Sequence, residues 1–175
     1  AYTIDFSAEI SDNNENNPMG NYTFTFSTYD RIDTMEVSGN VIDAETLEPV
    51  KSVLVGLYES SIFKEEKGDT IFRTQAMIRV ARSDESGHFV IKGVARDKKY
   101  RIFALEDMDG TYTFSQQAEK IAFTDRIITT DCYPDTRQDT IWLDNMRIKD
   151  LVRVPYTHLT PEDVVMRLYQ EKQTE

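Results

Sequence analysis

The stretch "SDESGHFVIKGVARDKKYRIFALED", residues 83–107, decides the fold class. It consists of a polar turn, a short alternating strand, a charged turn and a second alternating strand. Asp84 and Gly87 predict the first turn, because both residue types are favoured where the backbone reverses sharply. Phe89 and Ile91 alternate with polar residues and are expected to face a core. The stretch therefore predicts a central β-hairpin within an all-β fold.

Period-two alternation continues on both sides of this hairpin, which favours further strands. Polar segments rich in Asn, Asp, Pro and Gly separate them. The segment "SIFKEEKGDT", residues 61–70, is expected to be an exposed loop. Many short strands with turns between them indicate a sandwich or a barrel. The further strands are predicted at residues 2–10, 22–29, 35–43, 52–60, 76–83, 121–130 and 139–148. One shared core is predicted from Val37, Val41, Val53, Val55, Phe89, Ile91, Tyr100 and Ile102.

The composition describes a globular and strongly acidic chain. Its 175 residues are 39% hydrophobic, with nine Phe and nine Tyr, and its net charge is −11. An acidic surface repels phosphate backbones and anionic lipid, which argues against nucleic acid and electrostatic membrane binding. No apolar run approaches the roughly 20 residues of a membrane span, so this segment is not expected to insert into a membrane. The single cysteine, Cys132, cannot form an internal disulfide and does not settle the compartment.

The tail "LTPEDVVMRLYQEK" allows two structures. Thr160 as N-cap followed by Pro161 resembles a helix start, which favours a helix. Val164, Met166 and Leu168 also alternate with exposed residue types, which is the pattern of a strand. The helix is the preferred prediction, with the strand as the alternative.

Motifs for catalysis are absent from the sequence. The two histidines, His88 and His158, lie seventy residues apart and belong to no zinc-binding motif. Each is expected to be a surface residue, with His158 in a polar loop. Cys132 follows Asp131, a poor neighbour for a reactive thiolate. No phosphate-binding loop or nucleophile elbow occurs. The sequence therefore predicts neither an enzyme nor a catalytic or cofactor-binding residue.

The acidic stretch "LEDMDGTYTFSQQAEK", residues 105–120, is the one candidate for an ion site. Asp107 and Asp109 are two residues apart and precede Gly110, as at the start of a calcium loop. Three further side chains could add oxygen ligands: Thr111, Ser115 and Glu119. The match to an EF-hand is incomplete, because Ala118 stands where that loop carries its bidentate glutamate. The preferred interpretation is a polar turn, with calcium at Asp107 and Asp109 as the alternative.

Aromatic residues near this turn raise the possibility of sugar binding. Tyr112 and Phe114 flank the turn, and Trp142 lies in a predicted strand. Exposed aromatic rings stack on sugars, but alternating aromatic residues in strands usually face the core. The core interpretation is preferred for all three.

Two parts of the chain together resemble a known fold family. They are "VSGNVIDAETLEPVKSVLVGLYE" and the later "ARSDESGHFVIKGVARDKKYRIFALED", which are similar to the transthyretin-like (prealbumin-type) sandwich. Carboxypeptidase regulatory-like and collagen-adhesin B-type domains share this plan. The resemblance covers about residues 33–131 and implies a fold rather than an activity. The residues that carry it are Val37, Gly39, Val41, Pro49, Val53, Val55, Leu57, Asp84, Gly87, Phe89, Ile91, Tyr100 and Ile102.

The resemblance has limits that matter for function. Adhesin-type domains often carry a Lys–Asn isopeptide bond with the lysine on the first strand, but "VSGNVID" contains no lysine, so this bond is not predicted. Similarity to carboxypeptidase regulatory domains implies no peptidase activity, because the zinc ligands of those enzymes lie in another domain.

The first segment, "AEISDNNENNPMGNYTFTFST", resembles the last strands of a bacterial Ig-like domain. Together and in this order, the two segments resemble a family of Bacteroides-type cell-envelope lipoproteins. They imply three parts: the end of an incomplete Ig-like domain at 1–29, a transthyretin-like sandwich at 33–131, and an extra strand with a C-terminal extension leading to a further module at 132–175. The chain does not begin with Met, and we expect a mature or truncated form whose leader has been removed.

The sequence as a whole predicts an all-β, Ig-like or prealbumin-like sandwich with a short C-terminal extension. The expected function is that of a non-enzymatic structural or binding module of an exported, surface-associated bacterial protein. The alternative is an accessory domain that binds carbohydrate or calcium. The expected partners are other domains of the same chain, and a surface protein or glycan. The resemblance implies an extracytoplasmic location in the cell envelope, anchored through an N-terminal lipid that this segment lacks.

Overall fold

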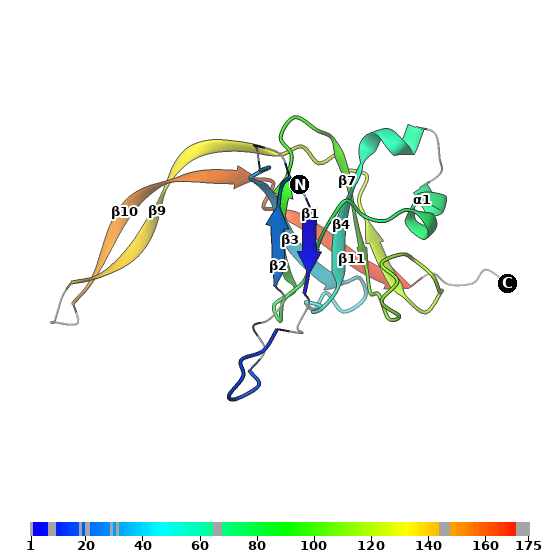
Figure 1. The fold of residues 1–175 in the computed structure, drawn as a ribbon, viewed down its shortest axis with the longest axis horizontal. Helices are drawn as coiled ribbons and strands as arrows, with labels where there is room; N and C mark the ends of the chain where they lie inside the picture. The colour runs from blue at the N-terminus through cyan, green and yellow to red at the C-terminus, as the bar shows by residue number, and fades with distance from the viewer. Residues whose placement is uncertain are drawn as a thin grey trace.

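The computed structural model describes residues 2–6, 10–17, 19, 22–28, 30, 32–64, 68–143 and 148–170. Over these residues the protein is nearly all β, with one short 3-10 helix and one α-helix (Figure 1). The strands are β1 Tyr2–Asp5, β2 Thr23–Phe26, β3 Met35–Asp43, β4 Leu54–Glu59, β5 Arg79–Arg82, β6 His88–Val94, β7 Tyr100–Leu105, β8 Lys120–Phe123, β9 Asp131–Leu143, β10 Ile148–Thr160 and β11 Val164–Gln170. The helices are η1 Ser60–Lys64 and α1 Gly68–Thr74.

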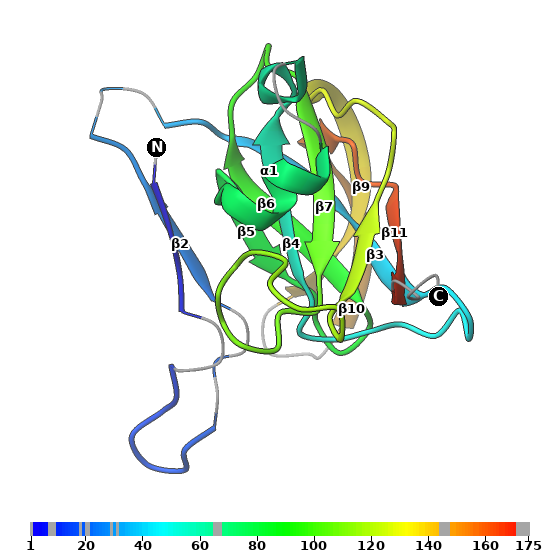
Figure 2. The ribbon, with the colours of Figure 1, turned by 90° about the vertical axis from the view of Figure 1, so that its right-hand side faces the viewer.

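Seven strands form one sheet in the order β5-β4-β7-β8-β11-β3-β6. All its neighbours are antiparallel except β11 and β3, which run parallel. The sheet folds back on itself, so that its two ends, β5 and β6, are brought together by the turn at 83–87 (Figure 2). The result is a sandwich-like all-β body around a main core, which confirms the predicted fold class.

The predicted core is confirmed. All eight residues named from the sequence belong to one buried cluster, and none is more than 2% exposed. The cluster also contains Val164, Met166 and Leu168 of β11. Full burial of each large aliphatic side chain is worth about 1.5–3 kcal/mol, so this shared core is the main stabilising feature of the body.

The predicted central hairpin does not form, although both of its strands do. β6 pairs with β3, whereas β7 pairs with β4 and β8. Residues 95–99 therefore cross from one part of the folded sheet to another. The turn before β6 is as expected: Asp84 Oδ1 accepts the Ser86 backbone N–H at 2.8 Å, and Gly87 has φ +75°. This turn connects β5 to β6. Alternation identifies strands but carries no information about their partners, which explains the error.

The preferred prediction of a helix for the tail is wrong, and the strand alternative is correct. β11 lies between β3 and β8, so both of its edges pair with neighbours. Val164, Met166 and Leu168 are at most 2% exposed, while Val165 between them is 50% exposed. Burial of three side chains in the core and pairing of both edges outweigh a local capping signal. The sheet thus extends past residue 131, where the sequence resemblance ended.

The predicted exposed loop at 61–70 is helical where the structure describes it, at 61–64 and 68–70. Its exposure is only partial, because Ile62 and Phe63 are half-buried on the outer side of the sheet. Both pack against a second hydrophobic cluster, which consists of Tyr58, Ile71, Phe72, Phe103, Leu105, Phe114 and Ile121. Phe114, at 2% exposed, is therefore a core residue, as the preferred interpretation held.

Strands β9 and β10 form a separate two-stranded sheet that we call the arm (Figure 1). Each strand has 13 residues, and their register runs from Thr160↔Asp131 to Ile148↔Leu143. At about 3.4 Å per residue the arm is about 44 Å long. The single strand predicted at 139–148 is wrong, because this range includes the end of β9 and the start of β10. Figure 1 shows the arm projecting away from the body.

The first two strands pair with each other. β1 and β2 form a two-stranded antiparallel sheet, with Tyr2 opposite Phe26. Their assignment to an Ig-like domain stays a prediction. Within the described part of the chain, no helix has the length and apolar character that crossing a membrane requires.

Candidate functional site

The acidic turn brings together the side chains that the sequence singled out. Oxygen atoms of Asp107, Asp109 and Glu119 lie within 4.8 Å of one another. Asp109 is exposed, whereas Glu119 is fully buried. The turn follows β7 and precedes β8, so two neighbouring strands of the sheet hold its ends.

Donors from the protein itself surround these carboxylates. Glu119 accepts the backbone N–H groups of Met108, Ser115 and Gln116 at 3.0–3.3 Å. Asp109 Oδ2 accepts the Ser115 hydroxyl at 2.6 Å, and this bond is the main reason why the pKa of Asp109 is lowered. The acidic side chains thus organise a turn of the backbone, and calcium binding at Asp107 and Asp109 stays an untested alternative.

Asp107 has a further electrostatic partner. Its side chain is fully buried, and its Oδ2 lies 4.0 Å from Arg82 Nη2. The same carboxylate accepts the backbone N–H groups of Thr111 and Tyr112 at 3.1 and 3.3 Å. The Arg82 guanidinium also lies 5.7 Å from the centre of the Tyr112 ring. Tyr112 is half-buried within this network.

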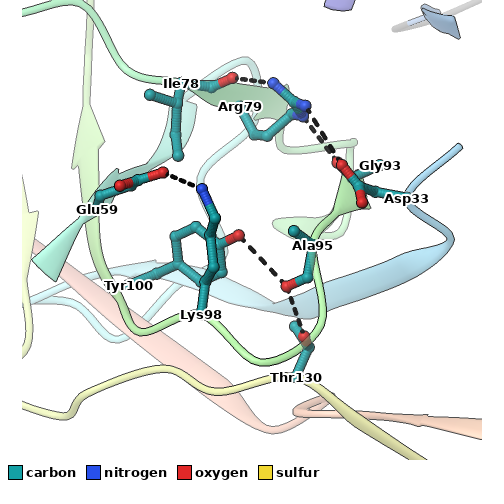
Figure 3. A network of polar contacts seen from close by, with 9 residues as sticks. All are labelled: Asp33, Glu59, Ile78, Arg79, Gly93, Ala95, Lys98, Tyr100 and Thr130. Carbon is teal, nitrogen blue, oxygen red and sulfur yellow. Dashed lines mark hydrogen bonds and ion pairs between the residues drawn. The ribbon is translucent and has the colours of Figure 1, made fainter. Parts of the chain in front are cut away.

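A polar pocket of about 250 Å³ lies beside the two ends of the folded sheet (Figure 3). Arg79 at the start of β5 donates from Nε to the Gly93 carbonyl of β6 at 2.8 Å and from Nη1 to the Ile78 carbonyl at 2.6 Å. Its Nη2 lies 4.0 Å from Asp33 Oδ2. The guanidinium therefore bridges the seam between β5 and β6, where no strand ladder joins them.

The other side of this pocket is equally engaged by internal contacts. Lys98 donates to Glu59 at 2.5 Å, and this bond raises the pKa of Lys98. Tyr100 and Thr130 both donate their hydroxyls to the Ala95 carbonyl, at 3.3 and 3.1 Å. Burial raises the pKa of Tyr100. Two cations face two carboxylates in a space smaller than most ligand sites, so the pocket is best described as a structural network.

A densely connected titratable side chain lies at the base of the arm, and sequence reasoning missed it. His158 is in β10 rather than in a polar loop, and its side chain is only 12% exposed. Its Nδ1 lies 2.7 Å from the Tyr156 hydroxyl and 3.3 Å from Asp135 Oδ2, and its Nε2 lies 3.0 Å from Glu162 Oε1. The Tyr133 ring stacks on the imidazole with centroids 4.7 Å apart.

Electrostatic effects around His158 follow from these contacts. The pKa of Asp135 is lowered, first by the Thr136 backbone N–H and then by the Tyr156 hydroxyl and His158. The pKa of Tyr156 is raised, first by loss of solvation and then by the charge of Asp135. The alternation Val152, Val154, Tyr156, His158 is the sequence signal that could have placed this histidine on a strand face.

The remaining candidates are dispersed over the molecule. His88 is half-buried at the start of β6, and its backbone N–H donates to Asp84. Cys132 is a free and partly exposed thiol in β9. Trp142 also lies in β9, as predicted, but its side chain is outside the described part of the structure.

Comparisons with known proteins leave the family of this chain open. No family model matches the sequence, and no curated protein matches it. A solved structure that is similar to part of it is the T6 backbone pilin of serotype M6 Streptococcus pyogenes, which has a modular three-domain structure. The identity is 14%, and the match covers 78% of this chain and 29% of the pilin, with a TM-score of 0.32. A TM-score this low supports no conclusion about function.

Proposed function

We propose that this chain is a non-enzymatic structural module of an exported, surface-associated bacterial protein, and that the arm is its contact element. The arm is the observation that carries the proposal. Two long strands leave a well-packed body and pair with each other, and the structure describes no third strand beside them. An element of this kind exposes backbone donors and acceptors along both edges.

The arm has little stability of its own unless it contacts another part of the protein or a partner. A two-stranded sheet alone is marginally stable in water. Two of its apolar side chains are largely exposed, Tyr133 at 49% and Leu151 at 61%. Open strand edges in proteins are either protected or used to bind another chain by adding a strand. A contact role explains why so much ordered chain lies outside the core.

Prolines divide the arm into two parts. Pro134 lies in β9 and Pro155 in β10, both in the half nearer the body. A proline lacks the N–H that an added strand would need, and it is tolerated on an edge where its nitrogen faces outward. Residues 136–143 and 148–154 contain no proline. The distal half of the arm is therefore the part whose edges are suited to a partner.

The polar clusters of the body support a structural role over catalysis. The carboxylates of the acidic turn accept protein donors, and the charged groups of the pocket pair with one another. Nδ1 of His158 faces the Asp135 carboxylate and the Tyr156 hydroxyl, and Nε2 faces the Glu162 carboxylate, rather than a nucleophile. These internal contacts occupy the carboxylates and the imidazole that general acid–base catalysis would need.

Two leucines with matched exposure allow a direct test in the bacterium that encodes the protein. Leu151 in the arm is 61% exposed, and Leu47 in the body is 63% exposed. Leu151→Cys and Leu47→Cys would each be made in a Cys132→Ser background and treated with a maleimide that does not cross membranes. We expect Leu47→Cys to react in intact cells and Leu151→Cys to react several-fold more slowly in cells than in the purified protein.

The two halves of the proposal fail separately in this experiment. Absence of labelling at both positions in intact cells, with labelling after lysis, would contradict surface exposure. Equal rates for Leu151→Cys in cells and in the purified protein would show that the arm has no partner there.

A further inference from the structure

The arm joins the body at a small joint where two passages of the chain run side by side. β9 begins at Asp131, which is opposite Thr160 at the end of β10. Where the chain leaves the body, Arg96 Nη2 lies 2.7 Å from Asp131 Oδ1 at the start of β9. Where it returns, the Pro161 carbonyl accepts the Ser38 backbone N–H of β3 at 3.0 Å. The direction of the arm is therefore decided by few residues, and changes in their contacts act on the whole arm.

His158 connects the parts of this joint. Its Nδ1 faces Asp135 of β9 and the Tyr156 hydroxyl of its own strand, while Nε2 faces Glu162 in the connection to β11. The Tyr133 ring covers one face of the imidazole. The imidazole ring thus lies between the β9–β10 residue pairs nearest the body and the segment that connects β10 to β11.

The number of protons on the imidazole decides how many of these contacts are favourable. A protonated imidazole has an N–H on both nitrogens, whereas a neutral one has a single N–H. With both protons, Nδ1–H can donate to Asp135 and Nε2–H can donate to Glu162. With one proton, the tautomer that fits these neighbours keeps Nε2–H on Glu162 and lets Nδ1 accept the Tyr156 hydroxyl, so that the Nδ1 lone pair faces Asp135 Oδ2 at 3.3 Å. Deprotonation therefore replaces the attraction between Nδ1–H and Asp135 by a repulsion and removes the positive charge that attracts Glu162.

We propose that His158 is a proton-operated clasp that fixes the arm on the body when the imidazole is charged and loosens the joint when it is neutral. The titratable groups in contact with the ring are Tyr133 and Asp135 of β9, Tyr156 of β10, and Glu162 before β11. The lowered pKa of Asp135 keeps its carboxylate charged in mildly acidic solution. The inference concerns the mobility of the arm and stands whether or not the arm binds a partner.

The composition of the chain makes this clasp experimentally accessible. Carboxylates generally titrate below about pH 5, and thiols above about pH 8. Histidine is the side chain that changes charge between these limits. The protein has only two histidines, and His88 lies in β6 rather than among the contacts described for the joint. A change in arm mobility between pH 5.5 and 7.5 can thus be assigned with two variants.

The experiment measures the distribution of distances between the arm and the body. Spin labels would be attached to Gln138→Cys in β9 and Glu48→Cys in the loop after β3, both exposed positions, in a Cys132→Ser background. Pulsed dipolar spectroscopy gives the distribution at pH 5.5 and at pH 7.5. We expect a narrow distribution at pH 5.5 and a distribution roughly twofold wider at pH 7.5.

Matched variants separate the clasp from general effects of pH. His158→Gln should give the same wide distribution at both pH values, because glutamine does not titrate. His88→Gln should keep the difference seen in the parent protein. Glu162→Gln is exposed enough to fold normally and should reduce the difference, because the charged imidazole loses one anionic partner. A parent distribution that does not change with pH, or a change that persists in His158→Gln, would overturn the proposal.

Discussion

The body and the arm are built from the same period-two pattern, yet the pattern has different consequences in the two regions. In the body, alternating residues such as Phe89 and Ile91 are at most 1% exposed. In the arm, Val152 and Val154 alternate equally well but remain only half-buried. The difference is a covering layer, because the folded sheet of the body covers its own inner face and the arm has no second layer in the described structure. Alternation specifies a strand, and only a facing layer turns that strand into a source of stability.

The largest expected effect separates the two regions through β11. Met166 is fully buried, and the neighbouring Val165 is 50% exposed. Met166→Ala should lower the free energy of unfolding by about 2–5 kcal/mol, because it leaves a cavity in the core. Val165→Ala should change it by less than about 0.5 kcal/mol. Urea denaturation of both variants measures this. A cost at Val165 equal to that at Met166 would mean that the tail does not present alternate faces.

A second test addresses how closely β3 and β11 approach. A Cβ added at Gly39 would lie 1.9 Å from the Val164 carbonyl oxygen, which is a backbone atom. Gly39→Ala should therefore force the parallel strands apart and destabilise the protein by about 1–3 kcal/mol. Gly68→Ala is the control, because its Cβ would meet only the Phe63 ring at 3.7 Å. Equal thermal stability of the two variants would contradict the close β3–β11 contact.

The inner strands could be predicted because their information is local. Val37 and Val41 have an even spacing within one predicted strand, Val53 and Val55 have one within the next, and all four lie in the core. The same locality explains the errors. The residues around Tyr100 contain no signal that β7 pairs with β4 instead of β6. Pairing depends on which distant strands bury their faces together, and a single sequence does not express that.

The candidate sites show the same division between local and distant information. Asp107, Asp109 and Glu119 are close in sequence, so they could be grouped from the sequence alone, and the structure places them close together. Two contacts of His158, with Tyr133 and Asp135, exist only because β9 and β10 pair over their full length. The apparent helix start at Thr160 concealed this end of β10. Contacts that depend on a long hairpin become visible only when its register is known.

A pH-dependent test compares ion pairs in the two regions. In the body, Lys120 of β8 donates to Asp43 of β3 at 2.7 Å, and this bond lowers the pKa of Asp43 from 3.8 to about 2. A lowered pKa means that folding favours the charged carboxylate. Its stabilisation is therefore present above about pH 4 and is lost as the pH falls through about 2.

Asp43→Asn should lower the stability modestly at pH 7, and its difference from the parent protein should diminish between pH 4 and pH 2. The arm supplies the control, because Asp139 lies 3.6 Å from Arg137 with both side chains at least half exposed. Asp139→Asn should be nearly silent, since exposed pairs contribute little. Urea denaturation as a function of pH measures both variants. A difference at Asp43 that is constant down to pH 2 would contradict the role of the ion pair.

Removal of the arm tests whether the body is independent of it. The register places Tyr156 opposite Asp135, so residues 136–155 can be replaced by Asn-Gly, which favours a two-residue hairpin turn. The core cluster contains no residue of β9 or β10, and we expect the midpoint of thermal unfolding to change by less than about 3 °C. Circular dichroism during heating measures this. Loss of cooperative unfolding would show that the arm supports the body.

The smallest effect is expected at the acidic turn, where calcium and a simple turn make different predictions. An ion that binds the native state at a hundredfold excess over its Kd stabilises by about 2.7 kcal/mol, which raises the melting temperature by several degrees. Glu119 and Asp109 already accept protein donors, and Arg82 Nη2 lies 4.0 Å from Asp107. An ion would compete with these contacts. We therefore expect millimolar calcium to raise the melting temperature no more than magnesium at equal ionic strength. Asp109→Asn should leave that result unchanged, because asparagine keeps an acceptor oxygen and tolerates turn geometry. A calcium-specific rise that Asp109→Asn abolishes would instead make this turn a binding site and distinguish it from the remainder of the body.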